Sequence, residues 1–196
     1  MPRSPKPLRS ALARFLRGND GMLVTEFVLV LPVFLFLMFG LYAYWDAFRA
    51  LNTAEKAAYA VSDLISRETR TMTPQQIDGL HDVMEYMMGN DLPVKMRVTS
   101  ITYSGVRQRY EVIWSRSPGG QRPQLTTTSL QTLVPRLPLV GDGESLILME
   151  ALVQFTPSIS PAPAFNIFMD EKEFELFIPT RPRFLSKVCL QGVACG

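Results

Sequence analysis

The chain has 196 residues, of which 47% are hydrophobic, 19% charged and 10% aromatic, so it can bury one core of ordinary size and is not disordered along its whole length. Its net charge of +2 is uneven, because five cations lie in the first twenty residues and the remainder sums to −2, which excludes a basic nucleic-acid-binding body. One histidine and two cysteines are too few for most zinc, haem or iron–sulfur sites, so we expect no metal and no cofactor.

An apolar segment near the amino terminus predicts a membrane span. The nineteen residues Phe27–Trp45 contain no charged side chain, and as a helix they roughly match the ~30 Å hydrocarbon core of a bilayer. Five cations precede the segment, whereas Asp46–Arg70 balances its acids and bases. The positive-inside rule then keeps the amino terminus in the cytoplasm and sends the rest of the chain across the membrane, with Tyr42, Tyr44 and Trp45 at the outer interface.

Two residues before the span indicate more than a plain anchor. Glu26 stands at its cytoplasmic mouth, where a carboxylate has a cost, and Gly21 lies five residues earlier. A cut after Gly21 would make Met22 the first residue, and Glu26 could neutralise the new ammonium of a neighbouring subunit, which would set the register between packed helices. The alternative is a flexible glycine before a helix and a glutamate that reaches back to the cytoplasm.

The residues around this point form a distinctive block. It consists of a basic leader, Gly21, the pair Glu26-Phe27, the pair Leu31-Pro32 and a Phe-rich run. A second, weaker motif is Arg181-Pro182-Arg183 near the carboxyl end, after a strand-like segment. Over roughly residues 14–50 the chain resembles the TadE-like family of tight-adherence (Flp) pilus assembly proteins.

The resemblance implies a pseudopilin or minor pilin that acts in assembling or initiating a surface pilus. Carried over to this chain, it makes Gly21 the last leader residue, Met22 the first mature residue, and Glu26 with Phe27 the assembly and register residues. The implied partners are the inner membrane, a prepilin peptidase, other pilin or pseudopilin subunits and the assembly machinery, with no nucleic acid and no small-molecule substrate. The alternative function is an uncleaved, membrane-anchored periplasmic binding or scaffold protein.

The helical pattern continues beyond the span. Apolar residues at three- and four-residue spacing predict a helix over 23–67, about twice as long as a bilayer requires. Small residues recur along one edge at Ala43 and Ala47, then at Ala50, Ala54 and Ala58. Either this edge packs against other pilin-like helices, because small residues allow close approach, or it lets the chain's own globular domain dock.

A second helix is predicted to begin at Pro74 and to end before Gly89. Thr73 can cap it, with proline at the first helical position and Gln76 at the third. His81 lies on this helix with no second histidine or cysteine nearby in the sequence. We therefore expect a surface histidine and no metal site.

Strand patterns dominate the rest of the chain. Alternating residues over 94–103 and 106–114, with Gly105 between them, predict a hairpin. Its solvated face is expected to carry Lys95, Arg97, Arg107 and Arg109. A short helix is predicted around 127–133, and the apolar run 144–155 predicts a central buried strand. The alternation over 171–178 predicts an edge strand. The solvent face of that strand would carry Asp170, Glu171, Glu173 and Glu175.

The fold expected from these elements is α+β and pilin-like, with a long amino-terminal helix, membrane-spanning in its first half, packed on an antiparallel β-sheet. Cys189 and Cys195 are expected to form a disulfide in an oxidising periplasm. The expected regions are a basic cytoplasmic leader over 1–21, a transmembrane and extended amphipathic helix over 22–70 and a periplasmic α+β domain over 71–196. The sequence contains no G-x-S-x-G and no phosphate-binding loop, so we expect an assembly protein and not an enzyme.

Overall fold

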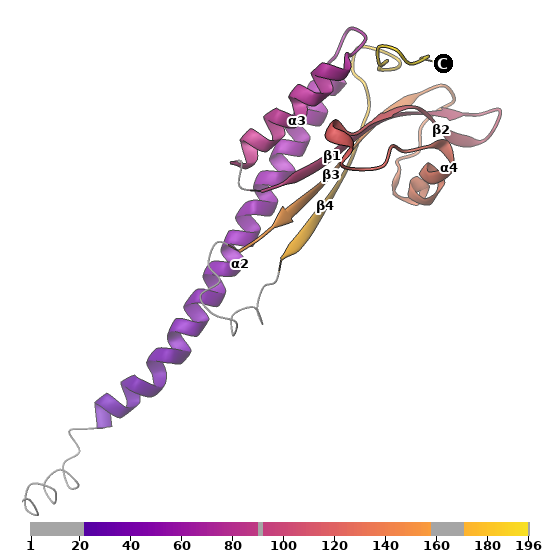
Figure 1. Ribbon diagram of the computed structural model, residues 1–196. Coiled ribbons are helices and arrows are strands. Elements are labelled where there is room, and N and C mark those ends of the chain that lie inside the picture. Colours follow the sequence, from indigo (N-terminus) through magenta and orange to yellow (C-terminus); the bar gives the residue numbers. More distant parts are fainter. Residues whose placement is uncertain (1–21, 90–91, 158–170, 196) are drawn as a thin grey trace, which may run out of the picture. The chain divides into compact units, whose positions relative to one another are not determined.

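The computed structural model describes residues 22–89, 92–157 and 171–195, which form two principal helices, a four-stranded sheet and short helical turns (Figure 1). They group into two compact units, one that reaches to Tyr42 and one that starts at Ala43. The leader, including Gly21, lies outside the described residues.

Helix α2, Met22–Ser66, matches the predicted helix to within one residue at each end and continues through Pro32. In the first unit, every side chain from Val24 to Met38 is exposed. From Val24 onward the helix is long and apolar enough to cross a bilayer, by length and composition. One amino-terminal helix of this kind fits a single-pass membrane anchor.

Helix α3, Pro74–Met88, begins and ends as its sequence signals predict. The Thr73 hydroxyl accepts a hydrogen bond from the Gln76 amide at 3.2 Å, and the Thr73 amide donates to the Gln76 side chain at 2.7 Å. These two bonds satisfy amides that have no partner within the helix. Gly89 ends the helix in the left-handed conformation, at φ 85°, which glycine adopts without steric cost.

The sheet is antiparallel throughout, with strands in the order β2-β1-β3-β4. Its strands are β1, Val94–Ser104; β2, Arg109–Arg116; β3, Ser145–Phe155; and β4, Lys172–Thr180. The expected hairpin, central strand and edge strand are therefore all confirmed. The second hairpin strand begins three residues later than predicted, because residues 105–108 form the turn and Gln108 takes a positive φ of 49°.

The second unit buries apolar side chains on both faces of the sheet. On one face, the carboxyl-terminal part of α2 and helix α3 pack over Val98 of β1 and Met149 of β3. On the other, α4 (Thr127–Leu130) and the 3-10 turn η3 (Gln131–Arg136) cover a smaller core around Leu148. The loop after β2 contains a further 3-10 turn, η2 (Pro118–Gly120). The long helix on a four-stranded antiparallel sheet confirms the expected α+β class.

Candidate functional site

The residues expected to be processed lie at the start of the described chain. Met22 is the first residue of α2, and Glu26 and Phe27 follow one turn later with exposed side chains. Positions 22 and 26 are four apart, so they lie on one face of the helix, about one turn from each other. A free amino group at Met22 and the carboxylate of Glu26 would therefore be carried on the same helix face.

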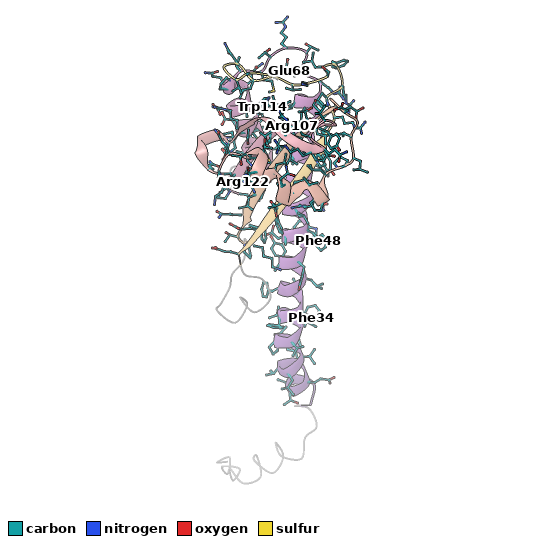
Figure 2. All side chains as sticks on the ribbon, turned by 90° about the vertical axis from the view of Figure 1, so that its right-hand side faces the viewer. Phe34, Phe48, Glu68, Arg107, Trp114 and Arg122 are labelled. Atoms are coloured by element: carbon teal, nitrogen blue, oxygen red, sulfur yellow. A yellow bond between two sulfur atoms is a disulfide. The ribbon has the colours of Figure 1, made fainter. Side chains whose placement is uncertain are left out.

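The apolar side chains of α2 point outward over much of its length. Figure 2 shows Phe34 and Phe48 projecting from the helix, where their exposed fractions are 58% and 64%. Burying aromatic side chains of this size away from water is favourable in free energy. Both side chains therefore form exposed apolar surface in the described part of the chain.

The small residues of α2 pack on the chain's own domain. Ala54 and Ala58 are fully buried in the core under the sheet, and Ala47 and Ala50 pack on aromatic residues of β3 and β4. Ala43 is partly exposed. For the four buried residues, the structure shows the second alternative that the sequence left open: a small side chain lets the helix approach the sheet closely.

The carboxyl end of α2 is held by the segment that follows β4. The Arg183 amide donates to the Ser66 carbonyl at 2.8 Å, and its guanidinium lies 2.7 Å from the Asp63 carboxylate. The last carbonyls of a helix have no internal partner, and its carboxyl end favours a cation. Ser62 adds a hydrogen bond to Thr180 of β4 at 2.6 Å. Arg183 of the Arg181-Pro182-Arg183 motif thus joins the end of α2 to the segment that follows β4.

The two cysteines form the expected disulfide, Cys189–Cys195. The loop that it closes is bound to the connection between α2 and α3. Met72 donates its amide to the Cys189 carbonyl at 2.9 Å and accepts from the Gln191 amide at 2.8 Å. The disulfide therefore closes a loop over 189–195, here called the carboxyl-terminal strap, near the same end of α2 that Arg183 contacts.

A buried ion pair on the face of the sheet opposite α2 was not expected. Arg97 and Glu150 are directly paired across β1 and β3, and two hydrogen bonds of 2.7 and 2.6 Å join the guanidinium to the carboxylate. Arg97 also donates to the Pro123 carbonyl at 2.7 Å, and Arg122 lies 3.8 Å from Glu150. The exposed fractions are 7% for Arg97 and 1% for Glu150, so the expectation of a solvated Arg97 was wrong.

The sequence contained a signal for this pair. Glu150 is the one acid inside the apolar run of β3, and Arg97 is a cation in the neighbouring central strand. A charge in a buried strand needs a partner of opposite charge. The strand pattern correctly predicted that Arg97 lies on the opposite face of β1 from the buried Val98. It did not predict that the loop containing Arg122 and Pro123 covers that face.

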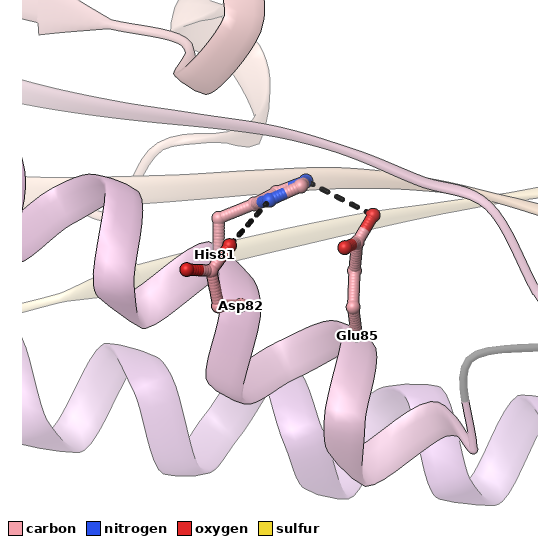
Figure 3. Close-up of side chains that lie close together, drawn as sticks. All are labelled: His81, Asp82 and Glu85. Atoms are coloured by element: carbon pink, nitrogen blue, oxygen red, sulfur yellow. Dashed lines mark ion pairs between the residues drawn. The ribbon is translucent and has the colours of Figure 1, made fainter.

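His81 is buried, with 7% of its surface exposed, so the expectation of a surface histidine was also wrong. Its Nε2 donates to the Val94 carbonyl at 2.9 Å, which ties α3 to the start of β1. Asp82 and Glu85 approach the two ring nitrogens at 3.8 and 3.6 Å (Figure 3). The hydrogen bond to the Val94 carbonyl gives the buried ring a polar partner.

Of the charges predicted for the solvated faces, Arg107 and Arg109 are exposed, whereas Lys95 is half-buried. Arg107 and Arg109 both contact Glu111, at 2.8 and 3.0 Å. Hydrogen bonds from Arg107 and then Arg109 lower the pKa of Glu111, and the bond to Glu111 raises the pKa of Arg107. Glu173 and Glu175 are exposed on the edge strand, as is Glu171 just before it. Asp170 lies outside the described residues.

The amino-terminal segment matches a known family. The family described as TadE-like protein matches residues 21–63, which confirms the resemblance seen in the sequence and extends it along most of α2. No curated protein and no solved structure is significantly similar to the chain. The chain therefore carries a TadE-like segment, and this match supports involvement in Tad pilus assembly, a structural role.

Proposed function

We propose that this chain, with its TadE-like segment at residues 21–63, is a pseudopilin or minor pilin of a tight-adherence (Flp-type) pilus that acts in pilus assembly or initiation. The observation that carries the proposal is the coincidence of the family match with the exposed apolar half of α2. The matched segment begins at Gly21, where processing would occur, and ends inside the part of α2 that packs on the sheet. One helix thus joins a membrane segment to a folded domain.

In this proposal a prepilin peptidase cuts the chain between Gly21 and Met22 on the cytoplasmic side of the inner membrane. A glycine before the cut allows close approach to the backbone. The new ammonium at Met22 then meets Glu26 of a neighbouring subunit in a medium of low dielectric constant, where opposite charges attract strongly. Phe27 supplies apolar contact beside the acid, and the pair sets the register between helices.

The proposed topology follows from the charge on either side of the span. Residues 1–21 are a basic cytoplasmic leader, 22–70 form the transmembrane and extended helix, and 71–196 form the periplasmic α+β domain. An oxidising periplasm is consistent with the Cys189–Cys195 disulfide. The partners are then the prepilin peptidase, other pilin or pseudopilin subunits and the assembly machinery.

Two substitutions separate processing from assembly. We expect Gly21→Ala to block cleavage, because a β-carbon at the cut hinders the peptidase, whereas Gly18→Ala in the same leader should be cleaved normally. We expect Glu26→Gln to be cleaved and yet to reduce surface pili strongly, whereas Glu55→Gln, an exposed acid on the same helix, should leave piliation unchanged. The readouts are the mass of the membrane-extracted protein and the number of surface filaments.

The alternative function predicts a different pattern. An uncleaved, anchored periplasmic binding or scaffold protein would retain its leader in wild type and would be indifferent to both Gly21→Ala and Glu26→Gln. Normal piliation with Glu26→Gln would remove the proposed charge pairing even if cleavage occurs. Each arm therefore tests one step of the proposal separately.

A further inference from the structure

The two edges of the sheet are covered differently. On β2, the outer edge is bonded by side chains of the region that follows it: Val112 donates its amide to the Thr127 hydroxyl at 3.1 Å, and the Tyr110 carbonyl accepts from the Gln131 side chain at 3.1 Å. These contacts occupy backbone groups that would otherwise attract another strand. The chain thus closes one edge of its own sheet.

The other edge, formed by β4, is open within the described part of the chain. β4 pairs with β3 along its whole length, from Lys172 to Thr180, and no described residue forms a backbone hydrogen bond with its outer side. Figure 1 shows β4 at the margin of the sheet. Pro179 removes one donor near its end, but the rest of the strand keeps its amides and carbonyls. A row of such groups is a template for a further strand.

The side chains of β4 give this edge a defined chemistry. Leu176 and Ile178 are buried on the face toward α2, whereas Glu173 and Glu175 are exposed on the opposite face. Glu173 accepts one hydrogen bond from Gln154, at 3.0 Å. Glu175 lies 3.6 Å from the Arg136 guanidinium, and both side chains remain about half exposed, at 46% and 48%. The acids therefore keep much of their surface for an incoming strand.

An aromatic side chain lies on the helix beside this strand. Ser62 of α2 is hydrogen-bonded to Thr180, so this side of the helix faces the end of β4. Tyr59 is three residues before Ser62 and is therefore its neighbour on the helix surface. Its exposed fraction is 61%. A strand added to β4 would meet acids on one face and apolar surface on the other.

We propose that the outer edge of β4 binds an extended segment of a partner protein in which lysine or arginine alternates with apolar residues. A directly opposite residue on a paired strand lies about 4.5–5.5 Å away, and like charges at that distance are destabilising. Antiparallel pairing of two copies of β4 would place Glu175 against its equivalent when centred on Glu175, and Glu173 against Glu175 when centred on Phe174, so like charges disfavour a second copy in both of these registers. Main-chain hydrogen bonds give affinity, and the alternating cations give specificity. This surface does not include the processing and register residues Gly21, Met22, Glu26 and Phe27, and it goes beyond the proposed function.

Peptide binding to the purified full chain in detergent tests this surface. The probe is a fluorescein-labelled peptide of alternating lysine and valine, nine residues long as β4 is, and its binding is followed by anisotropy. We expect the double variant Glu173→Lys/Glu175→Lys to bind this peptide about tenfold more weakly and to prefer a glutamate–valine peptide by a similar factor. The matched control is Glu68→Lys/Asp82→Lys, which changes the net charge equally at sites away from β4 and should leave the preference unchanged.

A second probe separates strand addition from simple charge attraction. It has the same sequence, but the amides that face β4 are N-methylated, so it cannot form the ladder. We expect it to bind at least tenfold more weakly than the unmodified peptide. Equal binding of the two probes, or an unchanged preference after charge reversal at Glu173 and Glu175, would overturn the proposal. Neither readout depends on leader processing or on piliation, so the two proposals fail independently.

Discussion

Arg97 and Glu150 face each other across the two central strands of the sheet and are joined by two hydrogen bonds, of 2.7 and 2.6 Å, with almost no exposed surface. The attraction within such a pair is largely offset by the cost of removing both charges from water. Loss of one partner is different, because it leaves an unpaired buried charge.

We therefore expect Glu150→Leu to destabilise the domain by about 3–5 kcal/mol, whereas the double variant Arg97→Met/Glu150→Leu should recover most of that loss. Thermal and denaturant unfolding followed by circular dichroism measures both. Glu173→Leu, at an exposed position of β4, is the control and should change stability by roughly 0.5 kcal/mol or less. A double variant that is as unstable as the single one would show that the pair itself, and not the orphaned charge, determines stability.

Because the alanines of α2 are buried against the sheet, a larger side chain at one of these positions should destabilise the fold. Ala54 is fully buried, so Ala54→Leu should overpack the contact between α2 and the sheet and cost about 1–3 kcal/mol of unfolding free energy. Ala60→Leu, on the exposed side of the same helix, should be close to neutral. If Ala54→Leu keeps full stability and abolishes only pilus formation, the alanine edge serves other helices and not the chain's own domain.

The carboxyl-terminal strap should contribute modestly to stability. The disulfide joins residues six apart, and closing so short a loop is worth about 2 kcal/mol in the chain-entropy model. We expect Cys189→Ser/Cys195→Ser to lose about that amount and hydrogen exchange to rise first at the amides of Met72 and Gln191. Reductant should destabilise wild type and have no effect on the double variant. Unchanged exchange at both amides would show that the strap holds without the disulfide.

The hairpin turn predicts a dependence on pH. Hydrogen bonds from Arg107 and Arg109 lower the pKa of Glu111 below its ordinary value of about 4.3. A lowered carboxyl pKa contributes stability above the unfolded pKa, and this contribution is lost as the pH falls through the folded pKa. In Arg107→Gln, NMR titration should show the Glu111 pKa rising toward its ordinary value. Arg49→Gln, far from Glu111 in the sequence and not in contact with it, should leave that pKa unchanged.

The sequence predicted those features of the fold that local chemistry decides. Thr73 and Gln76 predict a helix start because they can cap only that end, and the apolar run of β3 predicts a central strand because both its faces need cover. Arg97 and His81 were misplaced for a common reason. Local sequence does not show what packs over a side chain: the loop with Arg122 and Pro123 covers Arg97, and the start of β1 approaches His81.

The acids of β4 and the alanines of α2 also show what a local sequence pattern can and cannot predict. The period of Glu173 and Glu175 was sufficient to predict an exposed edge strand, because solvent exposure needs no partner. The spacing of Ala54 and Ala58 predicted close packing but not its partner, since helices and sheets both accept a small side chain. The structure supplies that partner for the chain's own domain, whereas the side chains of α2 from Val24 to Met38 are exposed.

Under the proposed function, the chain is processed at the start of the TadE-like segment before it is used in pilus assembly. Intact mass and amino-terminal sequencing of the protein extracted from its native membranes measure this directly. We expect a single mature form that begins at Met22, with Glu26 as its fifth residue. A membrane-extracted protein that retains its sequence from Met1 would overturn the proposed processing and identify an anchored, unprocessed protein.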